Sequence, residues 1–89
     1  MRFKVEGENR AAGTGTGTSS SIEDASEVRW HVNAATGTYY TITVTNSADA
    51  TIGSLRVNGA TEGILVKSPS DKIYASNAAV LLSPVNTRV

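Results

Sequence analysis

Two glutamates near the start of the chain have the type and spacing of residues that bind cations or transfer protons. Glu6 and Glu8 are two positions apart, so on a strand their carboxylates point to the same side. Paired carboxylates of this kind bind Ca²⁺ or act as acid and base in glycoside hydrolysis. Hydrolysis also needs a deep cleft, which a chain of 89 residues rarely builds. We therefore expect a solvated strand edge or a calcium site here, and no catalysis.

Other catalytic groups are scarce. His31 is the only histidine, and the chain has no cysteine, which excludes disulfides and thiolate metal sites. A Ser-His-Asp arrangement would have to use His31, but no Gly-x-Ser-x-Gly elbow accompanies it. We expect His31 to be an ordinary surface residue and the protein not to be an enzyme.

A Gly-, Thr- and Ser-rich loop spans residues 11–21. It lacks the Gly-Lys-Ser/Thr sequence of a phosphate-binding loop. Such a tract is flexible on its own, so we expect a partner to order it, with Thr14, Thr16 and Thr18 in contact. Ser20 and Ser21 each precede an acidic residue by three positions, which predicts a capped helical turn over 22–26.

Alternation of apolar and polar residues predicts about eight short strands. Asn58 and Gly59 predict a tight turn, because both residues tolerate positive φ, and Pro84 is expected to bend the chain between the last two strands. The predicted strands span 2–6, 27–33, 38–45, 51–57, 64–67, 72–75, 79–82 and 85–89.

The alternation also predicts which side chains face the core. Two exposed aromatics, Tyr39 and Tyr74, are candidates for stacking on a sugar or anchoring an interface. The side chains predicted to point inward are Val28, Trp30, Val32, Tyr40, Ile42, Val44, Leu55 and Val57, and those predicted to point outward include Thr41, Thr43, Thr45, Ser54 and Arg56.

The composition supports an all-β protein. The chain has 11 Thr and 9 Val but only 4 Leu, and β-branched residues suit pleated sheets. We predict one domain over 1–89, an antiparallel β-sandwich or jelly roll.

The formal net charge of zero argues against nucleic-acid binding, and no segment has the ~20 apolar residues of a membrane span. Residues 1–8 are charged and alternating, so we expect no signal peptide in this chain.

Several segments resemble carbohydrate-binding modules of families 6 and 35. They are 5–11 (VEGENRA), 28–33 (VRWHVN), 35–39 (ATGTY), 55–59 (LRVNG) and 80–87 (VLLSPVNT). The resemblance implies a galactose-binding-like β-sandwich, often with structural calcium, and Glu8 as the first metal ligand with Glu6 beside it. The chain is shorter than family members, and residues 60–89 lack the Trp that would stack on the sugar.

Two kinds of function remain after these exclusions. The first is a structural role in which the protein decorates or cements a larger particle, such as a virus or phage capsid, as a homo-oligomer in contact with other subunits. In this case the protein would be found in a virion or another extracellular assembly. The second is a carbohydrate-binding module that binds polysaccharide, with calcium as a structural ion.

Overall fold

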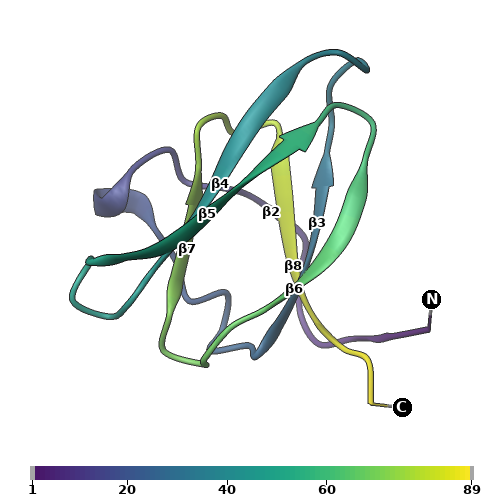
Figure 1. Cartoon of the computed structure of the whole chain (residues 1–89). Helices are drawn as coiled ribbons and strands as arrows, with labels where there is room; N and C mark the ends of the chain where they lie inside the picture. The colour runs from purple at the N-terminus through teal and green to yellow at the C-terminus, as the bar shows by residue number, and fades with distance from the viewer. Residues whose placement is uncertain (1, 89) are drawn as a thin grey trace.

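The computed structural model describes residues 2–88, and within this range the fold contains strands, turns and one short 3₁₀ helix (Figure 1). No helix in the described range is long and apolar enough to cross a membrane. The elements are β1 (Lys4–Val5), β2 (Arg10–Ala11), η1 (Thr16–Thr18), β3 (Glu27–Val32), β4 (Tyr39–Thr45), β5 (Thr51–Asn58), β6 (Glu62–Val66), β7 (Lys72–Ala75) and β8 (Val80–Asn86).

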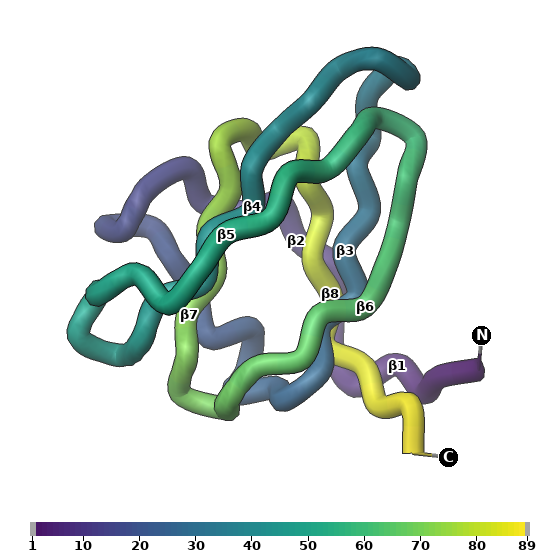
Figure 2. The backbone as a smooth tube through the Cα atoms, viewed as in Figure 1, coloured from purple at the N-terminus to yellow at the C-terminus, as the bar shows by residue number. Residues whose placement is uncertain are grey.

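These strands form two antiparallel sheets that pack face to face. One sheet has the order β1-β8-β3-β6, with β2 also paired to β8, and the other has the order β5-β4-β7. Figure 2 shows β5 and β6 following one another through a turn and then diverging, one in each sheet. The predicted all-β antiparallel sandwich is confirmed.

The core lies between the two sheets. The five-stranded sheet contributes the inward side chains predicted for β3, and Trp30 packs against this core while remaining partly exposed. Ala12 and Ile22 add apolar side chains from outside the long strands. The buried core consists of Ala12, Ile22, Val28, Val32, Ile42, Val57, Ile73, Ala75, Val80 and Leu82.

The prediction that Pro84 separates two strands is wrong, because β8 runs through it without a break. The Glu6 N–H donates to the Pro84 carbonyl at 2.9 Å, so the hydrogen-bonding side of the backbone at residue 84 faces β1. Proline has no N–H to return that bond. The missing donor therefore interrupts pairing on the β1 side, where β1 ends at Val5 and β2 begins only at Arg10. On the other side of β8, Pro84 stays in register with Val28.

The predicted helical turn over 22–26 is a left-handed turn. Ile22, Glu23 and Asp24 have φ of 53°, 57° and 57°. The capping role of Ser21 is nevertheless present, since its Oγ accepts a hydrogen bond from the Asp24 N–H at 3.2 Å. Left-handed backbone costs about 1–2 kcal/mol per residue, and full burial of an isoleucine contributes about 1.5–3 kcal/mol. Burial of Ile22 thus offsets the cost at its own position.

Two threonines at outward-facing positions of β4 are nevertheless buried. Thr43 and Thr45 are only 9% and 0% exposed. β4 is the central strand of its sheet, with Thr43 opposite both Ser54 and Tyr74, so neighbouring side chains cover it. A bulge after Val44 shifts the register at Thr45, whose hydroxyl donates to the Asn46 carbonyl at 3.1 Å.

The Asn58-Gly59 turn forms, but for a different reason from the one predicted. The positive φ of 60° falls on Ala60, and neither Asn58 nor Gly59 adopts one. Gly59 is required by close packing instead, because a Cβ there would lie 2.0 Å from the Ala35 carbonyl oxygen.

Candidate functional site

The two candidate metal ligands, Glu6 and Glu8, are both exposed and lie beyond the end of β1. The strand that would align their carboxylates stops at Val5, so the alternation behind the prediction does not extend through them. Between them, Gly7 packs closely on β8, since a Cβ at that position would lie 2.7 Å from Pro84 Cγ. The structure thus places Glu6 beside β8 and does not bring Glu8 into the same depression.

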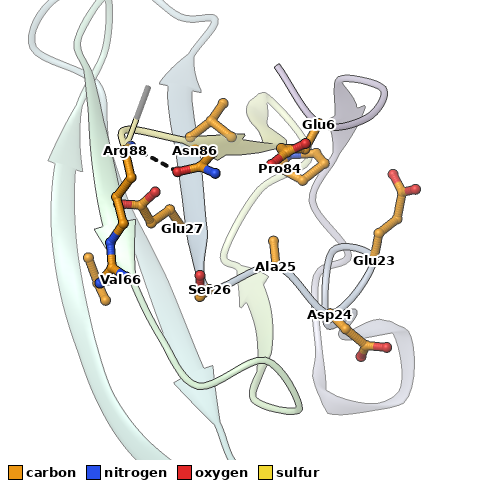
Figure 3. Close-up of a pocket in the computed structure, with 11 residues that line it drawn as sticks. Glu6, Glu23, Asp24, Ala25, Ser26, Glu27, Val66, Pro84, Asn86 and Arg88 are labelled. Carbon is orange, nitrogen blue, oxygen red and sulfur yellow. Dashed lines mark hydrogen bonds between the residues drawn. The ribbon is translucent and has the colours of Figure 1, made fainter. Parts of the chain in front are cut away.

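Glu6 lies on the rim of a shallow depression of about 700 Å³ at the end of the sandwich where the left-handed turn meets the C-terminal residues. Four carboxylates line it, from Glu6, Glu23, Asp24 and Glu27, and Figure 3 shows them spread around the rim. Within residues 2–88, no three His, Cys, Asp or Glu side chains converge closely enough to hold a metal ion. The calcium site remains a prediction.

Two of these carboxylates have partners within the chain. Glu23 forms an ion pair with Arg10. Glu27 accepts hydrogen bonds from the hydroxyl and the backbone N–H of Thr87, the latter at 2.7 Å. These bonds, with a smaller contribution from the charge of Arg88, lower the pKa of Glu27 below its ordinary value. These hydrogen bonds hold Thr87, which follows β8, beside Glu27 at the start of β3.

The two candidate aromatics lie on the outer face of the β5-β4-β7 sheet. Tyr39 is 51% exposed, and the Arg56 guanidinium lies 4.3 Å from the centre of its ring in a cation–π contact. Tyr74 is half-buried opposite Thr43. One face of the Tyr39 ring is therefore occupied by Arg56, which leaves the other face for a ligand.

Thr14, Thr16 and Thr18, the residues predicted to contact a partner, are exposed, but their loop is ordered by the chain itself. The Thr18 hydroxyl accepts hydrogen bonds from the N–H groups of Thr14 and Gly15 at 3.1 and 3.3 Å. At the two ends of the loop, the Ala75 N–H donates to Gly13 at 2.9 Å and Ser20 bridges to Ile73. The expectation that a partner must order this loop is therefore not needed to explain its structure.

His31 projects from the outer face of β3, opposite Glu62 on one side and Leu81 on the other. It is half-buried, and its Nδ1 has no hydrogen-bond partner among the described residues.

The sequence interpretation missed an apolar groove of about 260 Å³ between the edges of the two sheets. Leu55 points inward as predicted but is 38% exposed, because the groove is open over it. Ile52 and Val66, at 59% and 73% exposed, lie on the margins of the groove. Both residues are apolar yet out of phase with the inward positions Leu55 and Leu65, and that break in alternation was the available signal. The groove is lined by Ile42, Val44, Ile52, Gly53, Ser54, Leu55, Leu65, Val66, Lys67 and Asp71.

A buried lysine closes one end of this groove. Lys67 is 7% exposed, and its ammonium group donates to the carbonyls of Ser68 and Pro69 at 3.2 and 3.1 Å. Burial lowers its pKa, against the smaller opposing effects of Asp71 and Asp24. Because the ammonium group is hydrogen-bonded to the loop after β6, it does not project into the open part of the groove, which is apolar.

Comparison of the chain with protein-family models, with curated proteins and with solved structures returned no match. The resemblance to carbohydrate-binding modules therefore stays a prediction.

Proposed function

We propose that this protein is a non-enzymatic assembly module that docks through its sheet edges on other protein subunits. The observation that carries the proposal is the apolar groove between the edge strands β5 and β6. An uncovered strand edge offers unpaired N–H and C=O groups to another chain, and an apolar surface beside it favours burial. Side chains on this surface are Ile52, Leu55 and Val66, which are exposed although large and apolar.

The charge distribution supports the same function. The chain has a formal net charge of zero, so long-range repulsion does not oppose close approach to neighbouring subunits. A small neutral sandwich of this kind suits a decoration or cement protein of a virus or phage particle, acting by contact area and repetition.

The test is whether the chain is a stoichiometric part of a particle. A tagged chain, made in the organism that carries its gene, is separated on a density gradient and quantified by mass spectrometry. We expect most of the chain in a fast-sedimenting fraction at a fixed ratio to one other component. Val66→Lys should move it to the slow fraction, whereas Thr41→Lys, at an exposed position on the outer face of β4, should not. Recovery of the wild-type chain only as a free monomer or small oligomer would contradict the proposal.

The second candidate function is carbohydrate binding, and it rests on Tyr39. This ring is half-exposed on the outer face of the β5-β4-β7 sheet with Arg56 and Thr41 nearby as hydrogen-bonding groups. Affinity gel electrophoresis on a panel of polysaccharides, with calcium and with a chelator, tests it. Retardation that Tyr39→Ala abolishes and Thr16→Ala preserves would support sugar binding. Unretarded migration on every polysaccharide in both conditions would exclude it, and a retardation lost only in chelator would support the predicted calcium ion.

A further inference from the structure

Some edges of the two sheets are covered by other segments of the chain, and others are open. The outer edge of β7 is covered by the Gly-Thr loop, through Ser20 bonded to Ile73 at 2.8 and 3.1 Å and Gly13 bonded to Ala75 at 2.9 Å. One side of β8 is covered by β1 and β2. β5, in contrast, is paired only with β4 among the described strands, and its residues from Thr51 to Arg56 are all exposed. The chain protects one edge of the smaller sheet and leaves the other open.

The open edge has few of the features that normally prevent strand pairing. Natural edges are protected by charges, proline, bulges or short length. β5 is 8 residues long, contains no proline and carries one charge, that of Arg56. Its single irregularity is the bulge near Thr51, which leaves Gly53 to Asn58 in regular register with β4. Arg56 is held over the Tyr39 ring on the outer face and so does not block the edge.

We propose that β5 pairs antiparallel with β5 of a second copy of this chain, about a two-fold axis through Leu55, and that this pairing closes the apolar groove. The inference rests on the proposed assembly function and names its first partner and its contact strand. A symmetric antiparallel pair brings the same surface of each copy together, so the strand must be complementary to itself. The two copies would then share one continuous sheet formed from both β5-β4-β7 sheets.

The sequence of β5 meets this requirement. With Leu55 on the axis, Arg56 lies opposite Ser54 of the second copy, and no two guanidinium groups face each other. Val57, which is already buried in the core of its own chain, lies opposite Gly53 of the second copy, so no two side chains clash at that pair. Leu55 itself, the inward residue that the open groove leaves 38% exposed, meets its own copy. Each groove thereby receives apolar surface from the other.

A single cysteine provides a direct test, because the chain has none. Residues directly opposite in an antiparallel pair have Cα atoms about 4.5–5.5 Å apart, within the range for a disulfide. Leu55→Cys should therefore give a disulfide-linked dimer under mild oxidation. Thr41→Cys, exposed on the central strand β4, is the matched control and should remain monomeric on a denaturing gel.

Sedimentation equilibrium over a concentration series supplies the second readout. The wild-type chain should show a monomer-dimer equilibrium. Leu55→Lys should raise its dissociation constant by at least about tenfold, because two like charges would meet on the axis. Thr41→Lys should leave the constant unchanged, and circular dichroism of each variant verifies that the sandwich is folded.

Two results would overturn the inference. One is a wild-type chain that is monomeric at every concentration. The other is a dimer in which Leu55→Cys crosslinks no faster than Thr41→Cys, which would place the contact between the two copies elsewhere on the surface. Failure here is separable from failure of the assembly function. The gradient experiment can place the chain in a particle without a β5 pair, and a β5 dimer can form in a chain that enters no particle.

Discussion

The indole of Trp30 lies across Gly63, the residue directly opposite it on β6. A Cβ at position 63 would come within 2.7 Å of Cζ2 of that ring. The glycine thus makes room for the indole of the one tryptophan in the chain. The position of the indole depends on two strands, and neither strand reveals it alone.

Gly63→Ala should lower the free energy of unfolding by about 1–3 kcal/mol, because the added methyl group overpacks the Trp30 ring. Urea denaturation, monitored by tryptophan fluorescence, measures this free energy of unfolding. Gly17→Ala is the control, since a Cβ at position 17 meets open space. Equal stability of the two variants would show that the indole moves aside at no cost.

Glu27 should titrate below the ordinary glutamate value of about 4.3, because Thr87 donates two hydrogen bonds to its ionised form. A carboxyl whose pKa is lowered by folding stabilises the fold above the unfolded-state pKa. That contribution is lost as the pH falls through the lower folded-state value. The carboxyl ¹³C shift of Glu27 follows the titration. Thr87→Val should raise the pKa and Thr16→Val should not, while an unchanged value in Thr87→Val would refute the role of that bond.

Lys67 should make stability rise with pH in the alkaline range. Its pKa is lowered chiefly by burial, so between the folded-state value and the unfolded value near 10.4 the unfolded chain binds more protons. The cost of burying the charge is fully present below the folded-state pKa, falls as the pH rises between the two values, and is gone above the unfolded-state pKa. Urea denaturation from neutral pH to about pH 10.5 should show this rise in the wild-type chain and its loss in Lys67→Met. Lys4→Met, at an exposed position, is the control and should retain the rise.

Asp24→Gly should raise the free energy of unfolding by up to about 1 kcal/mol, since glycine adopts the left-handed region without the cost borne by other residues. Asp24→Val should lower it, because a branched side chain is poorly tolerated there. Thermal denaturation compares the two. Ser70→Gly, at an exposed turn position without positive φ, should be destabilising or neutral. An Asp24→Gly protein less stable than wild type would indicate that the Asp24 side chain contributes more than the backbone geometry costs.

The sequence by itself determined the long strands β3, β4 and β5, the faces of β3 and the all-β class, because alternation reports which side of a strand is buried. It missed the short strand β2 and divided β8 into two strands. It could also identify Tyr39 as an exposed aromatic, since that residue lies at the start of a strand with a clear polar face. These features depend on neighbours within one segment. The same local reasoning failed at Pro84. There β8 continues because it pairs with β3 on one side, and proline interrupts the pairing only on the side of β1 and β2.

Only the tertiary structure decided which surface is open. Ile52 and Leu55 lie on one strand and Val66 on another, and they form a groove because β5 and β6 enter different sheets after their shared turn. Burial of Thr43 and Thr45 likewise depends on strands to either side of β4. A local pattern fixes the direction in which a side chain points. Its exposure depends on whether strands distant in the sequence pack over that face.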